Sequence, residues 1–367
     1  MTDCFVHASD LHLDLPLGDL GKIHDRRDLL EQKAKAAWPS LCRLAIEREA
    51  SFLVLAGDIY HNGKALMGSQ RRFHDELLKL TEQGIRVFIS HGNHDPLVGH
   101  RLYRPYPDGV TVFRTGMPDT STVELRSGGT AYVSGLSFES RFERENLARR
   151  FEALERPAGP HVAVLHANLN SNSDHGNYAE CTVSDLEAAE VDYWALGHIH
   201  LRSDPIIVLG SGGTAAYSGN SQGRSFKPSE CHPKGALVVQ LDGDGIGEAE
   251  FVECDEVRFV REGLRIDPED EIGEVVDKIE GAARTAGNDA GHRPVVWKLE
   301  LTGRYTNPGE LRRTLEEDDE LLDGLSELLN EGGLADLDFK VDPRRSDDEL
   351  DSFTRLTLDP FKGPSVA

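Results

Sequence analysis

Short apolar segments that end in clusters of Asp, His, Gly or Asn recur through the first two-thirds of the chain. Helical stretches follow the first two segments, over residues 27–50 and 69–83, with apolar residues at helical spacing. This alternation of strands and helices predicts an α/β or layered α+β domain. The predicted strands cover residues 4–8, 52–56, 87–90, 161–165 and 193–196, and two more follow at residues 236–241 and 250–253.

The pattern changes near residue 255, which indicates a second domain. At roughly 150 residues per domain, a chain of 367 residues is expected to hold about two domains. We assign residues 1–254 to the first domain and residues 255–345 to a small α+β unit, and we expect residues 346–367 to form a weakly ordered tail. Leucines of the last helix, such as Leu321 and Leu325, are expected to pack in the core of the second unit. Its predicted helices cover residues 269–284, 308–315 and 321–329, and its strands cover residues 295–301 and 337–341.

Cysteine use and hydropathy are typical of a globular protein in a reducing compartment. The five cysteines are scattered and form no CxxC pair, so neither a disulfide framework nor a thiolate zinc site is indicated. No apolar run approaches the ~18 residues that a membrane span needs, and no signal peptide is evident. We therefore expect a cytoplasmic protein. The net charge of −24, concentrated toward the C-terminus, would normally argue against a nucleic-acid partner.

Five loops that follow predicted strands hold the side chains best suited to bind metal. A single Asp-x-His pair carries little information, because such pairs often arise by chance on protein surfaces. Five loops in order are more informative, since neighbouring strands of a sheet bring the loops at their carboxyl ends to one crevice. The loops are Ser9-Asp10-Leu11-His12, Gly57-Asp58-Ile59-Tyr60-His61, Gly92-Asn93-His94-Asp95, Leu165-His166 and Gly197-His198-Ile199-His200.

The donor atoms in these loops indicate two divalent metal ions. They offer carboxylate oxygen, imidazole nitrogen and one amide oxygen without sulfur, a set that suits Mn²⁺, Fe²⁺ or Zn²⁺ better than Ca²⁺ or an iron–sulfur centre. Asp58 is the natural bridging carboxylate, because the glycine before it allows a tight turn at the strand end. Two ions about 3.5–4 Å apart lower the pKa of a shared water and neutralise phosphoryl oxygens. The loops therefore predict hydrolysis of a phosphate ester.

In their order and residues, the five loops resemble the calcineurin-like metallophosphoesterases, whose pattern is D-x-H, G-D, G-N-H, H and G-H-x-H. The resemblance implies a β-sandwich flanked by helices, with the second unit as a small C-terminal capping domain. It also implies that His94 is catalytic, stabilising the charge of the transition state and helping the leaving oxygen take a proton. The metal ligands it implies are Asp10, His12, Asp58 and His200 for one ion and Asp58, Asn93, His166 and His198 for the other.

Other segments resemble the DNA-repair exonuclease branch of this family, of the SbcD and YhaO type. His61, three residues after Asp58, stands where that branch has a histidine that contacts the substrate phosphate. Ser218 stands where a proline is usual, which weakens the expectation of a rigid turn. The residues implied to donate hydrogen bonds to a DNA phosphate are Asn220, Gln222 and Arg224. The segments that carry this resemblance are residues 135–141, 145–148, 165–168, 177–181, 192–200, 217–224 and 234–235.

These features predict a two-metal DNA phosphodiesterase that prefers Mn²⁺ and acts as an exonuclease in double-strand-break repair. Its DNA contacts should be to the backbone, since the sequence holds no helix-turn-helix or zinc finger. The resemblance also implies a homodimer and an SMC-like coiled-coil ATPase partner. The basic residues that could form a rim for DNA are Arg71, Arg72, Arg101, Arg104, Arg141, Arg144, Arg149, Arg150, Arg224 and Lys227.

Two other functions stay open. The same metal chemistry would serve a phosphodiesterase that acts on a small nucleotide or a lipid headgroup. Alternatively, the chain could be a scaffold subunit of an SMC-like ATPase repair complex, although the complete ligand set and His94 argue against that role. The sequence also leaves open the native metal, the polarity of digestion, the oligomeric state and whether an ATPase partner is required.

Overall fold

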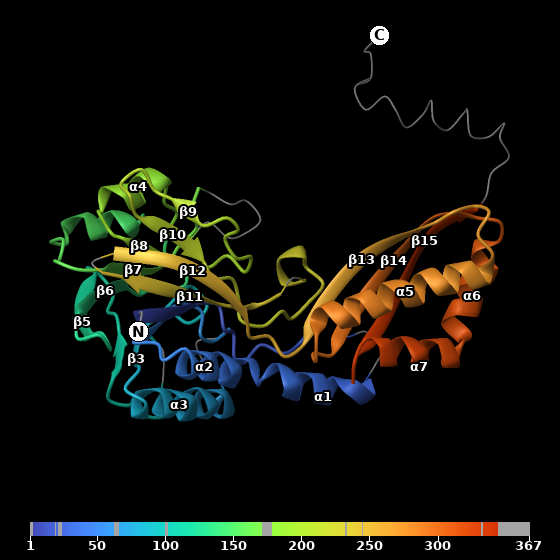
Figure 1. Ribbon diagram of the computed structural model, residues 1–367, viewed down its shortest axis with the longest axis horizontal. Helices are drawn as coiled ribbons and strands as arrows, with labels where there is room; N and C mark the ends of the chain where they lie inside the picture. The colour runs from blue at the N-terminus through green and yellow to red at the C-terminus, as the bar shows by residue number, and fades with distance from the viewer. Residues whose placement is uncertain are drawn as a thin grey trace, which may run out of the picture. The chain divides into compact units, whose positions relative to one another are not determined.

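The computed structural model describes residues 3–18, 20, 24–61, 66–99, 102–170, 178–231, 233–243, 245–331 and 333–343 of the 367-residue chain (Figure 1). The chain divides into two compact units, residues 1–259 and 260–367. The tail predicted at residues 346–367 lies outside the described residues. Within the described ranges, none of the helices has both the length and the hydropathy of a transmembrane span.

The first unit contains two six-stranded sheets, and the first of these (sheet I) places the loops of the predicted site at one edge. Its order is β12-β11-β1-β2-β3-β4, in which β1 to β4 are parallel and β11 is antiparallel to both of its neighbours, β1 and β12. Because β1, β2 and β3 are parallel, their carboxyl ends lie at the same edge. The strands are β1 (Asp3–Ala8), β2 (Phe52–Ala56), β3 (Arg86–Ser90), β4 (Val110–Val112), β11 (Gly235–Asp242) and β12 (Gly245–Glu253).

The second sheet of this unit (sheet II) has the order β5-β6-β7-β8-β10-β9. Its four central strands are parallel, and β5 and β9 are antiparallel edge strands. The predicted strands at residues 161–165 and 193–196 correspond to β7 and β8. The strands are β5 (Asp119–Glu124), β6 (Thr130–Leu136), β7 (His161–His166), β8 (Tyr193–Gly197), β9 (Ile207–Val208) and β10 (Thr214–Tyr217).

The two sheets pack face to face around an apolar core. The ring of Phe5 stacks on that of Phe52 with centroids 4.8 Å apart, and it meets the ring of Tyr193 from sheet II edge-on at 5.4 Å. These residues belong to a buried cluster that draws side chains from both sheets. Since every strand in the middle of each sheet is covered on both faces, the apolar runs in the sequence are explained by this sandwich.

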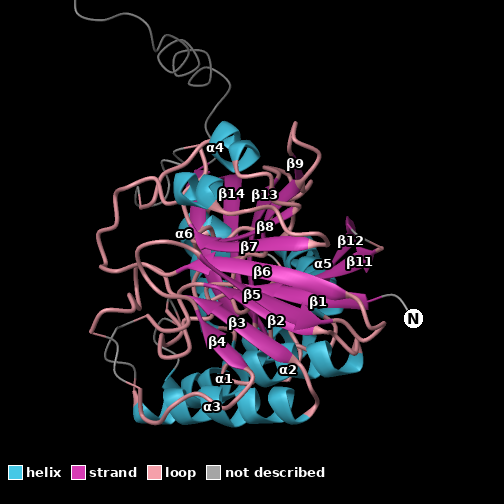
Figure 2. Cartoon of the chain, turned by 90° about the vertical axis from the view of Figure 1, so that its left-hand side faces the viewer, coloured by secondary structure: helices cyan, strands magenta, loops and turns pink. Residues whose placement is uncertain are grey.

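Helices cover the outer faces of both sheets (Figure 2). On sheet I, Trp38 and Phe73 pack with ring centroids 4.9 Å apart in a cluster that also contains strand residues. On sheet II, the rings of Phe151 and Trp194 pack at the same centroid distance of 4.9 Å. This α/β sandwich confirms the predicted fold class. The covering helices are α2 (Ala37–Glu47) and α3 (Met67–Glu82) on sheet I, and η1 (Ala148–Ala153) and α4 (Val183–Ala188) on sheet II.

The prediction of a single helix over residues 27–50 is wrong, because the chain forms two helices there, α1 (His24–Ala34) and α2. Pro39 explains the break. It has no N–H to donate to the carbonyl of Lys35, so a continuous helix through this point would lose a hydrogen bond. Proline is tolerated in the first turn of a helix, which is where Pro39 lies in α2.

The second unit is a three-stranded sheet, β13-β14-β15, with helices packed against it. Trp297 and Leu299 of β14 are buried in its core with Leu321, Leu325 and Leu329, as expected for the leucines of the last helix. A role as a capping domain stays a prediction. The elements are β13 (Arg258–Ile266), α5 (Ile272–Ala290), β14 (Val295–Tyr305), α6 (Pro308–Glu317), α7 (Asp319–Leu328), β15 (Leu334–Pro343) and, in the first unit, the short turn η2 (Pro228–Glu230).

The buried carboxylate of Asp185 organises the N-terminus of α4. Its Oδ2 accepts hydrogen bonds from the backbone N–H and the hydroxyl of Thr182 at 2.8 and 2.7 Å and from Asn146 Nδ2 at 2.8 Å. Its Oδ1 accepts from Arg149 Nε at 2.8 Å. Burial by itself raises the pKa of Asp185, but these donors outweigh it and hold the pKa well below its usual range.

We expect Asp185→Asn to lower the free energy of unfolding by about 1–3 kcal/mol at neutral pH, because an amide nitrogen would face hydrogen-bond donors. Since the pKa of Asp185 is depressed in the folded state, its carboxylate stabilises the fold above its unfolded pKa of about 3.9. That stabilisation is lost as the pH falls toward the folded pKa. Denaturant unfolding of both proteins from pH 7 to pH 3 measures the difference, and equal stability at pH 7 would contradict the expectation.

Candidate metal centre

The loops after parallel strands of both sheets lie against one another. The backbone N–H of Asp10 donates to the carbonyl oxygen of Gly57 at 3.0 Å, which joins the loops after β1 and β2. Asp58 Oδ1 accepts from the backbone N–H of His94 at 2.9 Å, which adds the loop after β3. Asp10 Oδ2 accepts from the backbone N–H of His198 at 3.1 Å, which adds the loop after β8. The fold therefore places the loops predicted from the sequence in one site.

A first group of candidate ligands gathers around His200. Its Nε2 is 3.2 Å from His12 Nε2 and 3.8 Å from Asp10 Oδ1. Ligand atoms of these three side chains lie within 4.8 Å of one another. Asp58 Oδ2 approaches the same group, 3.9 Å from His12 Nε2. These are the four residues that the family resemblance implied for one ion.

A second group gathers around His166. Its Nε2 is 3.0 Å from Asn93 Oδ1 and 3.5 Å from Asp58 Oδ2. Asp10, Asp58 and His166 also place ligand atoms within 4.8 Å of one another. The ring of His198 lies beside that of His166, with centroids 5.2 Å apart. Asp58 therefore approaches both groups, as expected of a bridging carboxylate.

Hydrogen bonds orient two of these imidazoles so that acceptor atoms converge. His166 Nδ1 lies 2.9 Å from the carbonyl oxygen of Ala56, which can only accept, so Nδ1 carries the hydrogen. With the hydrogen on Nδ1, the lone pair of Nε2 faces the oxygens of Asn93 and Asp58. Likewise His200 Nδ1 lies 2.5 Å from Glu230 Oε1, and its Nε2 faces the first group. Because a cation would satisfy these converging acceptors, both donor sets fit divalent metal ions.

The pKa shifts of the clustered side chains also favour a bound cation. Burial raises the pKa of Asp58 well above its usual range, and the nearby charges of Asp10 and Asp95 raise it further. Burial also lowers the pKa of His12 well below its usual range, helped by the charges of His200 and other cationic neighbours. At His200, burial alone would lower the pKa, but the hydrogen bond to Glu230 and the charge of Asp10 raise it. Buried carboxylates that repel one another form an environment that a divalent cation stabilises.

Four of the candidate ligands have a left-handed backbone conformation that non-glycine residues rarely adopt. Each such residue costs on the order of 1–3 kcal/mol and persists only where the surrounding structure holds it. Here the loop-to-loop hydrogen bonds supply that constraint. The residues and their φ angles are Asp10 (52°), His12 (43°), Asp58 (52°) and His198 (101°).

Three glycines that precede candidate ligands are required by close packing. In each case a Cβ atom would come much nearer to a neighbouring atom than real Cβ atoms do. This explains why glycine precedes the Asp, Asn and His of these loops. A Cβ would lie 2.3 Å from His166 Nδ1 at Gly57, 2.4 Å from Asp58 Oδ1 at Gly92 and 1.7 Å from the carbonyl oxygen of Ala56 at Gly197.

His94 and His61 stack beside the first group, with ring centroids 4.3 Å apart. His94 Nδ1 donates to the carbonyl oxygen of His61 at 3.0 Å, so Nε2 is its free nitrogen. Burial and the charge of His61 lower the pKa of His94 to about 4. Both imidazoles line the same cleft as the candidate ligands. Their catalytic and phosphate-contacting roles stay predictions.

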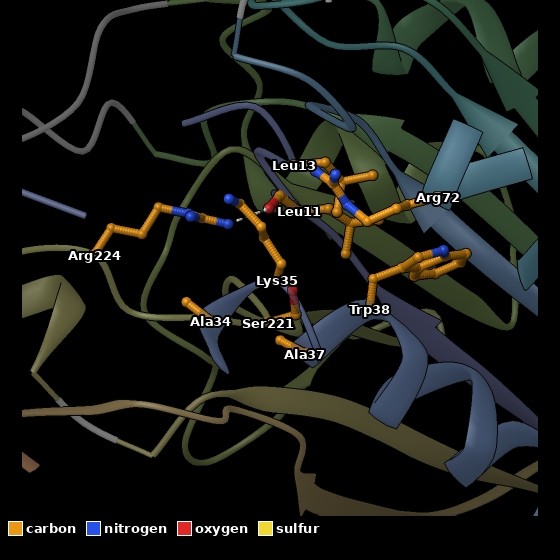
Figure 3. A pocket seen from close by; sticks show the side chains of 9 residues that line it. All are labelled: Leu11, Leu13, Ala34, Lys35, Ala37, Trp38, Arg72, Ser221 and Arg224. Atoms are coloured by element: carbon orange, nitrogen blue, oxygen red, sulfur yellow. Dashed lines mark hydrogen bonds between the residues drawn. The ribbon is translucent and has the colours of Figure 1, made fainter. Parts of the chain in front are cut away.

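The three residues predicted to donate hydrogen bonds to DNA differ in their exposure. Asn220 and Gln222 are each 1% exposed, and both donate hydrogen bonds within the chain. Arg224 is half-buried and lines the cleft. Its Nη2 also donates to the carbonyl oxygen of Leu11 at 3.1 Å, a hydrogen bond that Figure 3 shows beside a separate, smaller pocket. The hydroxyl of Ser218 is 3.0 Å from that of Ser9, a contact that proline could not make.

Sequence reasoning gave no role to two buried carboxylates that support the site. Asp95 Oδ2 accepts from the backbone N–H of Ile59 at 2.9 Å, and its Oδ1 accepts from Gly92 N–H at 3.1 Å, so it ties the β2 loop to the β3 loop. Its place at the end of the Gly92-Asn93-His94-Asp95 loop was the available signal. Glu230 bonds to His200 from a turn 30 residues further along the chain. No pattern in the sequence indicates that contact.

The candidate ligands open onto a cleft of about 1100 Å³. Three of the predicted basic residues, Arg141, Arg224 and Lys227, line it. Others form ion pairs elsewhere, such as Arg149 with Asp185 and Arg150 with Glu145. The cleft therefore combines a cluster of metal-ligand side chains with cationic walls.

An α/β sandwich whose strand-end loops gather His, Asp and Asn side chains beside a cationic cleft has the fold and the donor set of a metallophosphoesterase. The chain belongs to the calcineurin-like phosphoesterase family, whose family model matches residues 5–202. This confirms the family predicted from the five loops.

Curated relatives support the same family. The chain is 30% identical over 366 residues to the uncharacterized metallophosphoesterase YhaO of Bacillus subtilis, covering 98% of this chain and 85% of the relative. It is 24% identical over 289 residues to the DNA double-strand break repair protein Mre11 of Methanocaldococcus jannaschii, covering 75% and 73%. It is also 31% identical to the UDP-2,3-diacylglucosamine hydrolase of Azotobacter vinelandii, over 130 residues that cover 35% and 45%.

Proposed function

We propose that this phosphoesterase is an exonuclease that hydrolyses DNA phosphodiester bonds from strand ends. It uses two divalent metal ions and prefers Mn²⁺. The observation that carries the proposal is the pair of ligand groups that share Asp58 at the base of a large cationic cleft. Similarity to a protein named for double-strand break repair supports DNA as the substrate. In this proposal the enzyme acts on DNA in the cytoplasm.

Each ligand group would hold one ion. Asp10, His12, Asp58 and His200 form one ligand set, and Asp58, Asn93, His166 and His198 form the other. When bound, the ions would supply positive charge for the phosphoryl oxygens and a water of lowered pKa. The protein's own contribution is orientation, since the tautomers of His166 and His200 are set by their hydrogen bonds.

The remaining groups of the cleft would act on the DNA directly. His94 Nε2 is free to exchange a proton with the leaving oxygen, because Nδ1 is bonded to His61. His61 and Arg224 would contact the substrate phosphate, and Arg141 and Lys227 would attract the flanking backbone. Asn220 and Gln222 would contribute by fixing the backbone of their loop, given their burial.

Backbone contacts of this kind are local, so they are compatible with a net charge of −24. The proposal further assigns residues 255–345 to a capping domain. It includes a homodimer and an SMC-like coiled-coil ATPase partner. These assemblies rest on the resemblance alone, and co-purification with such an ATPase tests the second.

We expect wild-type protein with Mn²⁺ to digest end-labelled linear duplex DNA and to spare a covalently closed circle. His94→Ala should lower the rate by about 10²–10⁴-fold, as for loss of a general acid, with metal content unchanged. His74→Ala is the matched control, because His74 is a buried histidine of α3 outside the cleft and bonds to the carbonyl oxygen of Pro105. Equal digestion of both DNA forms would reject the exonuclease.

A second candidate function is hydrolysis of a small nucleotide or lipid-linked phosphodiester. The similarity to UDP-2,3-diacylglucosamine hydrolase over 130 residues favours it. In that case bis-p-nitrophenyl phosphate would be hydrolysed with Mn²⁺ while linear DNA stayed intact even in low salt, where DNA binding is strongest. Failure of both substrates, despite two bound ions, would instead support the scaffold role.

A further inference from the structure

Glu230 is a buried carboxylate beside the candidate metal centre that none of the predicted roles includes. It ends the short turn η2 and is 6% exposed. Its Oε1 lies 2.5 Å from His200 Nδ1. Its Oε2 accepts from Asn220 Nδ2 at 3.0 Å and from the backbone N–H of Arg224 at 2.9 Å. A charge this deeply buried requires partners, and Glu230 has donors on both oxygens.

These contacts fix how His200 faces the first ligand group. The two nitrogens of an imidazole point in different directions, so a ring held at Nδ1 by Glu230 presents Nε2 toward Asp10 and His12. The same segment also holds the backbone of His200, because Lys234 Nζ donates to the carbonyl oxygen of His200 at 2.9 Å. Both the ring and the main chain of this ligand are therefore anchored from one place.

The two ligand groups differ in the charge of this support. His166, in the second group, has its Nδ1 bonded to a neutral backbone carbonyl, that of Ala56. His200 has its Nδ1 bonded to a carboxylate, which makes the imidazole a stronger ligand and adds negative charge near one ion only. The two groups therefore contain similar ligand types, but only the histidine of the first group is hydrogen-bonded to a charged residue in this way.

We infer that Glu230 is a positioning residue that sets the tautomer and orientation of His200, and that it strengthens binding of the ion at the first group over the ion at the second. This inference rests on the proposed binding of two metal ions. Loss of such a hydrogen-bond partner typically weakens metal affinity by about 10–100-fold. Loss of the Glu230 carboxylate should therefore lower the affinity for the ion at the first group and leave the affinity for the other ion unchanged.

Titration of the full-length protein with Mn²⁺, followed by the electron paramagnetic resonance signal of free Mn²⁺, tests this inference. Wild type should bind two equivalents. Glu230→Gln keeps the shape and one acceptor oxygen but removes the charge, and it should weaken one ion by about 10-fold or more while the other keeps its wild-type affinity. Glu230→Asp, which withdraws the carboxylate by one methylene, should weaken the same ion.

Two comparisons separate positioning from general stabilisation. In a His200→Ala background, Glu230→Gln should weaken Mn²⁺ binding no further, because the ligand it positions is gone. Asp185→Asn, at a buried carboxylate that does not line the cleft, should lower stability without changing either affinity. Wild-type affinities in Glu230→Gln, or equal weakening of both ions, would overturn the inference. Absence of Mn²⁺ binding by wild type would instead reject the proposed function.

Discussion

Replacing Asp58 by Asn should abolish hydrolysis of both DNA and bis-p-nitrophenyl phosphate, with a rate loss on the order of 10³-fold or more. Asp58 Oδ2 lies 3.5 Å from His166 Nε2 and 3.9 Å from His12 Nε2, so it is the carboxylate that approaches both ligand groups. An amide offers a single neutral oxygen, so it lacks the negative charge and the second oxygen with which a carboxylate bridges two cations. Initial rates with Mn²⁺, measured beside the metal content of the purified protein, test this expectation.

The same substitution should leave the metal-free protein at least as stable as wild type. Burial raises the pKa of Asp58, and so do the charges of Asp10 and Asp95, which means that its ionised form destabilises the fold at neutral pH. Added Mn²⁺ should stabilise wild type, by about 2.7 kcal/mol at 100 times the dissociation constant, but should not stabilise Asp58→Asn.

Asp185→Asn provides the matched control for Asp58, because it makes the same change at a buried carboxylate outside the cleft. It should show the opposite pattern, with lower stability and unchanged Mn²⁺-dependent activity. If Asp58→Asn retained two metal ions and wild-type rates, Asp58 would not be the bridging ligand.

The central strands of the fold could be predicted from sequence because they are buried on both faces. β2 (Phe52–Ala56) is apolar throughout and matches its predicted range. The edge strand β5 (Asp119–Glu124) was missed, since Val123 is its one fully buried residue and its other positions resemble a polar loop. Pairing with β6 creates this strand, and pairing is a long-range contact that local composition does not report.

The same limit explains which parts of the site could be predicted. Asp10 and Asp58 lie two residues beyond the ends of β1 and β2, and His166 is the last residue of β7. The ends of apolar parallel strands therefore locate all three. Glu230 reaches His200 through a turn in a Gly- and Ser-rich segment, and its contact exists only once the chain has folded. Because Asn220 and Gln222 are polar and lie in a loop segment, the sequence suggests that they are exposed, yet the fold buries both.

Gly197→Ala should be among the most damaging single changes in the chain, although it adds one methyl group. The new Cβ would lie 1.7 Å from the carbonyl oxygen of Ala56 and 2.9 Å from His166 Nδ1. Moving Ala56 would break the hydrogen bond that orients His166, which joins Nδ1 to that carbonyl. We therefore expect the free energy of unfolding to fall by about 3 kcal/mol or more, together with loss of bound metal at the second group.

Gly68→Ala is the matched control for Gly197, because Gly68 is exposed near the start of α3. Among the residues that the structure describes, its Cβ would meet only Arg72 Nη1, at 3.6 Å. That substitution should be neutral or should stabilise the helix by up to about 1 kcal/mol. Urea unfolding of both variants, with and without Mn²⁺, separates the loss of stability from the loss of metal binding. If the variants were equally stable and equally loaded with metal, the close approach of β8 to the end of β2 would not require glycine. If Gly197→Ala alone lost stability and bound metal, the close approach of β8 to the end of β2 would explain why a glycine precedes His198.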